Sequence, residues 1–281
     1  MIANTDLRRL SLANLTVGRT AQAELIRAAA DAGFGKVGLL VMTATVQPLQ
    51  HEVLGRPEVI REIKATLQDT GVRVFDIEAF VLSPRTDLER FRPALELGAE
   101  LGATHISSIG TELAPDAAFL SPEARIDLFG RLCDEAVQFG LTVGVEFMLY
   151  RDIRTWRDAL QMIDGAGRAN AGLILDVLHF FRGGGQPSDL LQVPPGRIAY
   201  AQLSDCVASS PPVDGLAAEA RTSRLHVGEG AVPLNDILDL LPADLQLVIE
   251  TPVAVEQPLS ATERARSAAA HTANFLKSRS A

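Results

Sequence analysis

Cysteine is scarce in this sequence, with two among 281 residues, Cys133 and Cys206. Two cysteines are too few for a disulfide framework, and their positions show no metal-type pairing. We therefore expect both side chains to be reduced thiols that take no part in the chemistry.

Basic residues and long apolar runs are also few. The 26 Lys and Arg residues are outnumbered by 35 Asp and Glu residues, which gives a formal net charge of −9. A nucleic-acid partner requires clustered Lys and Arg, so this balance argues against one. No segment supplies the ~20 apolar residues that cross a bilayer, and Met1–Arg9 lacks the apolar stretch of a signal peptide. We expect a cytoplasmic protein without a membrane partner.

The sequence instead contains a repeated alternation of helix-like segments that end near glycine and apolar, strand-like runs. This alternation is typical of βα units, and continuous apolar runs fit parallel strands that are buried on both faces. The predicted strands are Leu10–Val17, Lys36–Met42, Val72–Leu82, Thr104–Gly110, Leu141–Met148, Gly172–Leu178, Arg197–Asp205 and Leu245–Pro252. The predicted helices include Ala23–Phe34, Val59–Gly71, Phe91–Ala103, Glu123–Gly140 and Ala261–Lys277.

Eight such strands predict a single (β/α)₈ barrel, with residues 1–281 forming one domain. A doubly wound open sheet is the alternative, but it usually has a G-x-G-x-x-G motif after its first strand, and none follows Leu10–Val17. The Pro/Gly/Ser/Ala-rich stretch Cys206–Ala220 is predicted to be a long loop after the seventh strand.

Polar residues lie at or near the ends of four of the later apolar strands: Glu146, Asp176, Gln202 and Glu250. Active sites of these barrels lie at the carboxyl ends of the strands. Burying several carboxylates together is unfavourable unless a cation compensates them. Three carboxylates and one amide oxygen form an all-oxygen ligand set that suits Mg²⁺ or Mn²⁺. Each residue alone is equally consistent with a helix cap or an ion pair, but four at equivalent places favour a metal site.

These motifs, in this order, carry a family resemblance. They are GVEF with Glu146, LDVLHFFRGG with Asp176 and His179, AQLSD with Gln202, RLHVGEG (Arg224–Gly230) and IETP with Glu250. The chain resembles, over essentially its whole length, the xylose-isomerase-like barrels of the sugar phosphate isomerase/epimerase superfamily. That superfamily includes ketose 3-epimerases, hydroxypyruvate isomerases, inosose dehydratases and dehydroshikimate dehydratases.

The resemblance implies a divalent metal ion, Mn²⁺ or Mg²⁺ with Co²⁺ as a further option, bound by the four strand-end residues. It also implies an isomerase or epimerase that removes a proton next to the carbonyl of a sugar or keto-polyol through a metal-stabilised enediolate. Glu146 and Glu250 are then the candidate acid/base pair, and the histidine matching His179 points toward substrate oxygen or metal-bound water. Relatives tend to form dimers or tetramers, so a homodimer or homotetramer is expected.

Three further residues are candidates for substrate binding. Arg224 matches an arginine that contacts substrate oxygens in the family, and Glu78 in FDIEAF ends the third strand, where a polar residue often faces the substrate. Arg182 is expected to line the pocket. His226 lies in a loop, and the sequence shows no partner for it.

Gln202 departs from the ketose epimerases, which usually have a histidine ligand on the seventh strand. This departure makes a dehydratase a serious alternative, in which the same proton abstraction is followed by loss of a hydroxyl that His179 protonates. A catalytically silent, sugar-binding barrel is a second alternative. An abasic-site endonuclease is disfavoured, because the five histidines are scattered and the acidic balance offers no groove for DNA.

Overall fold

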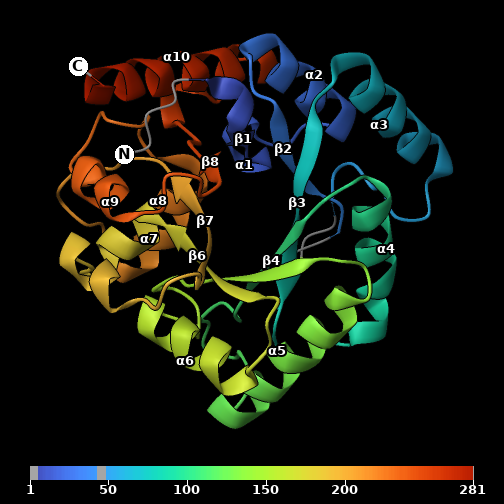
Figure 1. Cartoon of the computed structure of the whole chain (residues 1–281), viewed down its shortest axis with the longest axis vertical. Coiled ribbons are helices and arrows are strands. Elements are labelled where there is room, and N and C mark those ends of the chain that lie inside the picture. Colours follow the sequence, from blue (N-terminus) through green and yellow to red (C-terminus); the bar gives the residue numbers. More distant parts are fainter. Residues whose placement is uncertain (1–5, 43–48, 281) are drawn as a thin grey trace.

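The computed structural model of the protein describes residues 6–42 and 49–280, so the first part of Met1–Arg9 lies outside the described residues. Its parallel strands form a closed barrel in the order of the chain, β1 to β8, as the sequence predicts (Figure 1). The strands are β1 Ser11–Leu12, β2 Lys36–Leu40, β3 Arg73–Val81, β4 His105–Ile109, β5 Thr142–Glu146, β6 Ala171–Asp176, β7 Ile198–Leu203 and β8 Leu247–Ile249. The sequence-based prediction of a (β/α)₈ barrel is confirmed.

Helices surround the barrel, and α10 packs beside α2 to close the ring (Figure 1). The α-helices are α1 Asn14–Val17, α2 Gln22–Ala32, α3 Pro57–Thr70, α4 Arg92–Glu100, α5 Pro122–Val137, α6 Trp156–Ala166, α7 Val177–Arg182, α8 Leu216–Thr222, α9 Leu234–Leu240 and α10 Ala261–Ser280. Short 3₁₀ helices cover Leu7–Arg9, Leu88–Arg90, Pro187–Gln192, Val213–Gly215 and Ala254–Glu256. Among the described residues, no helix is both long and apolar enough to cross a bilayer.

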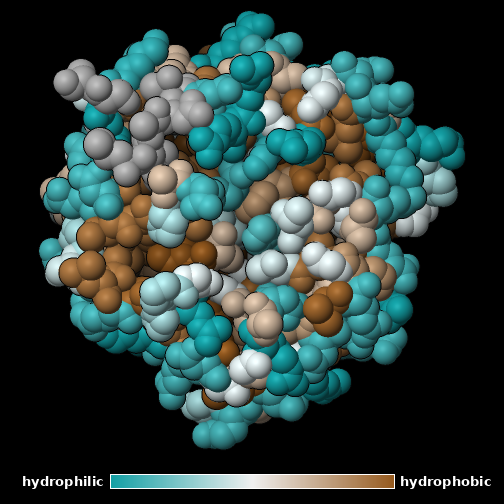
Figure 2. All heavy atoms as spheres, viewed as in Figure 1, coloured by the Kyte–Doolittle hydropathy of each residue, from teal (hydrophilic) through white to brown (hydrophobic). Residues whose placement is uncertain are grey.

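Local sequence sets the ends of these helices. Helix α6 begins with a capping box, in which the Thr155 side chain accepts from the Asp158 backbone N–H and the Asp158 side chain accepts in return. Helix α3 ends at Gly71, which has a positive φ of 72° and donates to the Leu67 carbonyl. Most side chains on the perimeter in Figure 2 are hydrophilic, because these helices turn their apolar faces toward the barrel.

Two predicted segments differ from the structure. Leu10–Val17 contains only the short strand β1 before the chain turns into α1, whose Thr16 side chain donates to the Ile249 carbonyl. Cys206–Ala220 is not one long loop, because Leu216 begins helix α8. Small and apolar residues are frequent in both segments, and such residues are compatible with a loop, a strand or a short helix.

Candidate active site at the carboxyl end of the barrel

The four polar residues predicted at the strand ends lie at the carboxyl end of the barrel. Glu146 and Asp176 are the last residues of β5 and β6, and Glu250 directly follows β8. Gln202 is paired with Asp176 in the register between β6 and β7. Glu146, Gln202 and Glu250 line a cavity of about 610 Å³ that also reaches His179. Parallel strands thus bring these side chains to one edge of the sheet.

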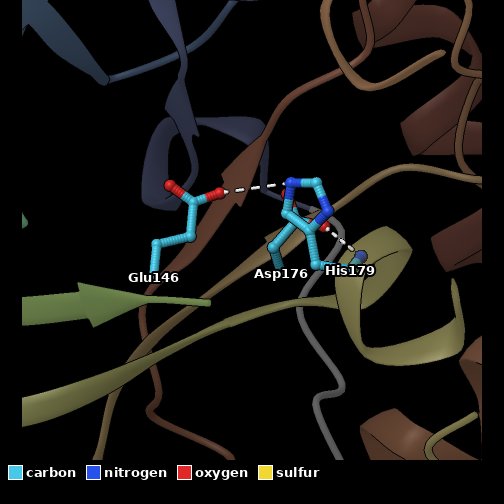
Figure 3. Close-up of side chains that lie close together, drawn as sticks. All are labelled: Glu146, Asp176 and His179. Atoms are coloured by element: carbon cyan, nitrogen blue, oxygen red, sulfur yellow. Dashed lines mark hydrogen bonds and ion pairs between the residues drawn. The ribbon is translucent and has the colours of Figure 1, made fainter. Parts of the chain in front are cut away.

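Glu146, Asp176 and His179 form the tightest group. Each offers a ligand atom, and the three atoms all lie within 4.8 Å of one another. Asp176 caps helix α7, because its Oδ1 accepts the backbone N–H groups of Leu178 (2.8 Å) and His179 (3.0 Å). His179 Nε2 lies 3.7 Å from Glu146 Oε1, and Figure 3 shows the two side chains pointing toward each other.

Glu250 and Gln202 join this group through a buried arginine. Arg224 Nη1 donates to Asp176 Oδ2 at 2.6 Å, and Arg224 Nη2 lies 3.0 Å from Glu250 Oε2. Gln202 Nε2 donates to the same Glu250 oxygen at 3.2 Å. The Gln202 Oε1 atom is buried and has no hydrogen-bond partner among the described residues. The four predicted ligands are therefore close together, but a guanidinium bridges two of them. His179, predicted to point toward substrate oxygen or metal-bound water, lies 3.7 Å from Glu146.

Burial dominates the electrostatics of this group. It raises the pKa of Glu146 well above the usual range, with repulsion from Glu250 and Asp176 acting in the same direction. Burial also raises the pKa of Glu250 to about 7 and lowers that of His179 to about 4. Burial acts to raise the pKa of Asp176 too, but the Arg224 charge and hydrogen bond outweigh it, so that pKa falls. These carboxylates would be stabilised in their charged form by a further cation.

Glu78 and Arg182 have different environments. Glu78 lies within β3, three residues before its end, because pairing with β4 continues to Val81. It nevertheless lines the cavity. Arg182 Nε donates to Glu219 Oε2 at 2.8 Å, and its Nη2 donates to the Val207 carbonyl. Arg182 is not among the residues that line the 610 Å³ cavity, because Glu219 of α8 holds its guanidinium elsewhere.

His226 has partners that the sequence does not reveal. Its Nε2 lies 2.8 Å from Glu256 Oε1 and 3.1 Å from Ser267 Oγ, and its ring stacks on His271 with centroids 4.3 Å apart. These residues are 30 to 45 positions further along the chain, so only the folded structure brings them together.

Sequence reasoning missed several residues near the cavity. Tyr150 and Arg151, which follow β5, and Arg221 of α8 all line it. Their position in the loop after β5, at the end of the barrel where active sites lie, was a usable signal for the first two. Asp76 lies beneath Glu78 on the same face of β3, and the Tyr200 hydroxyl donates to its Oδ2 at 3.3 Å. The spacing of two residues along a strand was the signal for Asp76.

Comparison with known proteins agrees with the barrel fold. The sequence matches the family described as xylose isomerase-like TIM barrel over residues 26–279. The chain belongs to this family. Among curated proteins, it is 32% identical over 120 residues to 3-dehydroshikimate dehydratase of Pseudomonas aeruginosa, a match covering 42% of this chain and 19% of that protein. It is 24% identical over 192 residues to inosose isomerase of Halalkalibacterium halodurans, covering 64% of this chain and 66% of that protein.

The chain thus spans less than two thirds of either curated relative. Among solved structures, this xylose isomerase-like barrel is similar to the IolI protein, which was solved with a bound zinc atom. The TM-score is 0.78 at 18% identity, and the match covers 96% of this chain and 98% of that one. At this identity, the likeness shows the shared fold alone. The two curated relatives are named as a dehydratase and an isomerase.

The residues of this xylose isomerase-like site fit a divalent cation. Two carboxylates and an imidazole place ligand atoms within 4.8 Å of one another, and mixed oxygen and nitrogen sets of this kind suit Mn²⁺, Co²⁺ or Zn²⁺. The unpartnered Gln202 Oε1 offers a further neutral oxygen. Glu146, Asp176 and Gln202 lie at or near the ends of strands, and His179 lies in helix α7, which directly follows β6. The backbone therefore fixes each ligand before any ion binds.

Proposed function

We propose that this protein is a divalent-metal-dependent enzyme that removes the proton next to the carbonyl of a polyhydroxy ketone, and that it acts as an isomerase or epimerase. The observation that carries the proposal is the convergence of buried Glu146, Asp176 and His179 at the carboxyl end of the barrel. The zinc atom in the IolI structure and the inosose isomerase relative also support it.

Glu146, Asp176 and His179 would hold the cation, with the Gln202 amide oxygen as a further ligand. When bound, a divalent cation supplies Lewis-acid stabilisation of the negative charge that develops on a carbonyl oxygen during proton abstraction. The ligand set proposed here keeps Glu146, Asp176 and Gln202 from the sequence-based prediction and adds His179. Glu250 is left outside it, because it is not among the residues whose ligand atoms all lie within 4.8 Å of one another.

Glu250 is the best-placed proton acceptor. It lines the cavity, and burial raises the pKa of its carboxyl to about 7, so the group can both take up and return a proton near neutral pH. Arg224 positions this carboxylate through a contact of 3.0 Å and also faces the cavity, where it can orient a substrate oxygen. Returning the proton from Glu250 to the neighbouring carbon, with a matching proton transfer between the two substrate oxygens, gives isomerisation. Epimerisation requires a second acid that delivers a proton to the opposite face of the same carbon, and Glu146, the other cavity member of the predicted acid/base pair, would supply it.

A dehydratase is the second candidate. It is supported by the 32% identity to 3-dehydroshikimate dehydratase and by glutamine at position 202. In this reaction Glu250 takes the proton, the electron pair forms a carbon–carbon double bond, and a hydroxyl leaves as water. In this candidate His179 is the proton donor instead of a metal ligand. Glu146, Asp176 and Gln202 would hold the cation. Because burial lowers the pKa of His179 to about 4, the imidazole is neutral at rest and would donate an N–H rather than a preformed imidazolium proton.

Deuterium exchange tests the shared first step. The protein is incubated with Mn²⁺ in D₂O and separately with D-fructose, an inosose and 3-dehydroshikimate, and NMR follows deuterium entering the carbon next to the carbonyl. We expect exchange that EDTA abolishes and that Glu250→Gln reduces at least 100-fold. Arg131→Gln, on the exposed side of α5, is the control and should behave as wild type. If none of the three ketones takes up deuterium, or if uptake is undiminished in EDTA, the mechanism is refuted.

The products then distinguish the candidates. An epimer or an aldose supports the isomerase, and an olefinic or aromatic product supports the dehydratase. A third reading is a silent sugar-binding barrel. It predicts that ketones bind to the wild type without exchange and that Glu250→Gln changes affinity alone.

A further inference from the structure

Two arginines in the cavity wall share a single carboxylate. Arg151, which follows β5, places its Nη2 3.5 Å from Glu112 Oε2 and donates from Nη1 to the Gly110 carbonyl at 2.7 Å. Arg221 of α8 donates to the same Glu112 oxygen. Among the described residues, no second carboxylate forms an ion pair with either arginine. Two guanidinium groups and one carboxylate leave one positive charge at the cavity wall.

Part of this positive charge is buried with an unused donor. Arg151 is only 5% exposed, and its Nε has no hydrogen-bond partner among the described residues. Buried polar groups in native proteins are almost always hydrogen-bonded, so this guanidinium has an unmet hydrogen-bonding capacity. The Nε itself has almost no exposed surface, so a ligand would meet the guanidinium through its Nη groups. The strongest acceptor for a guanidinium is an oxyanion, which can engage two of its N–H groups at once.

The rest of the cavity does not cancel this charge. Its lining contains five arginines and three glutamates: Arg19, Arg151, Arg221, Arg224 and Arg264, with Glu78, Glu146 and Glu250. Arg264 donates to the main-chain carbonyls of Val17 and Leu259, which satisfies its N–H groups without neutralising its charge. The cavity is thus rich in arginine although the whole protein has a net charge of −9.

The arginine pair lies close to the proposed reaction centre. The guanidinium carbons of Arg151 and Arg221 lie 5.9 and 5.6 Å from the centroid of the Tyr150 ring. That ring meets His179 edge to face, with centroids 5.7 Å apart. One aromatic side chain thus separates the pair from the Glu146, Asp176 and His179 group, so a single small molecule can reach both.

We propose that Arg151 and Arg221 form a subsite for a carboxylate, so that the substrate is a hydroxy-ketone carrying a carboxylate group. This inference rests on the proposed function, which supplies the ketone end. The one excess charge of the pair matches a carboxylate monoanion. A phosphate dianion would leave a negative charge at the same wall, so a ketose phosphate is the less complementary ligand.

Binding tests the subsite without catalysis. Shikimate, a cyclic polyol with a carboxylate and no ketone, is titrated calorimetrically into the Mn²⁺-loaded protein, with myo-inositol as the neutral probe and fructose 6-phosphate as the phosphate probe. We expect shikimate to bind at least ten times more tightly than either. Arg221→Gln should weaken shikimate binding at least tenfold without affecting myo-inositol, and Arg131→Gln, the same charge change on α5, should leave both unchanged.

Turnover separates this inference from the proposed function. With 3-dehydroshikimate and an inosose as ketones, Arg221→Gln should raise KM at least tenfold for the carboxylate alone and change kcat less than threefold. Equal shikimate binding by wild type and Arg221→Gln, or preference for fructose 6-phosphate, would overturn the carboxylate subsite. If shikimate binds as expected and no ketone exchanges its proton, the subsite stands and the proposed reaction fails. Circular dichroism checks that Arg221→Gln is folded. A parallel titration of Arg151→Gln tests the same subsite with a second variant, which should also weaken shikimate binding.

Discussion

At the scale of single residues, Arg224 has the most consequential position in the site. Its guanidinium lies between Asp176 and Glu250 and is 2% exposed. Removing one member of a buried ion pair leaves an uncompensated charge and typically costs about 3–5 kcal/mol. We therefore expect Arg224→Gln to lower the free energy of unfolding by roughly 3 kcal/mol in EDTA, measured by urea denaturation.

Mn²⁺ should restore part of that loss in Arg224→Gln, because a cation at Glu146 and Asp176 compensates the same carboxylates. The stabilisation by Mn²⁺ should thus be greater in the variant than in the wild type. A loss that is identical with and without Mn²⁺ would show that Arg224 acts only through packing.

Asp76 offers a test of buried charge away from the proposed metal ligands. It is 1% exposed inside the barrel, and burial raises the pKa of its carboxyl to about 7. The folded protein therefore holds a proton that the unfolded chain has lost above pH 4, so stability falls as pH rises from about 4 through 7. Asp76→Asn cannot ionise and should not show this fall.

Between pH 5.5 and pH 8, the free energy of unfolding of the wild type should fall by about 1–2 kcal/mol relative to that of Asp76→Asn. Urea unfolding at the two pH values measures it, and contributions from histidines cancel because both proteins contain them. Parallel pH dependence of the two proteins would mean that Asp76 is already ionised in the fold.

At the scale of elements, the sequence predicted those strands and strand-end residues that a local pattern of apolar and polar residues reveals. Apolar runs located the strands from β2 to β8, and the polar residue ending a run located Glu146 and Asp176. It did not predict α8, because the stretch Cys206–Ala220 lacks a clear apolar period. It also did not predict that Arg224 would bridge Asp176 and Glu250, since contacts over 48 and 26 positions depend on how strands and loops pack.

The turn that follows Arg224 can be tested at Gly230. A Cβ at this position would lie 2.2 Å from the Cys206 carbonyl oxygen, a backbone atom that cannot move aside cheaply. Asp205 Oδ1 fixes the same turn by accepting the Val232 N–H at 2.9 Å. Gly230→Ala should therefore destabilise the fold by about 2–3 kcal/mol through forced backbone shifts.

Gly196→Ala is the matched control for Gly230→Ala. Gly196 has a positive φ of 77° but open space around its Cβ position. Only backbone strain of about 1 kcal/mol is expected there. Thermal unfolding compares the two, and an equal loss of stability would mean that the turn adjusts freely. A weaker effect of Mn²⁺ in Gly230→Ala would link the turn to the site through Arg224.

At the scale of the whole molecule, the barrel collects acidic groups that the sequence distributes over separate strands. We propose that residues 1–281 fold as one domain, so that a charge at the barrel mouth acts on the stability of the entire chain. Glu78 and Glu146 have pKa values raised well above the usual range, first by burial and then by neighbouring carboxylates, and the pKa of Glu250 is about 7. The fold without a metal ion thus opposes ionisation of these groups.

This opposition predicts a pH-dependent response to metal. In EDTA, stability should fall as pH rises from 6.5 to 8.5, because groups with raised pKa values must lose protons that the unfolded chain has already lost. This window lies above the range in which buried His179, with its pKa near 4, contributes. Mn²⁺ binds the deprotonated ligands, so its affinity should increase over the same range. At a concentration 100 times its Kd, an ion that binds only the folded state adds about 2.7 kcal/mol.

The melting temperature in Mn²⁺ should therefore exceed that in EDTA at pH 6.5, and the gap should widen at pH 8.5. Glu146→Gln removes one proposed ligand while keeping its size, and it should narrow the gap at both pH values, whereas Glu229→Gln, at an exposed position, should leave it unchanged. A gap that is absent, or that stays constant while pH rises, would mean that the ion does not compensate these carboxylates. The neighbouring arginines, above all Arg224 with its ion pairs to Asp176 and Glu250, would then be the charges that compensate these buried carboxylates.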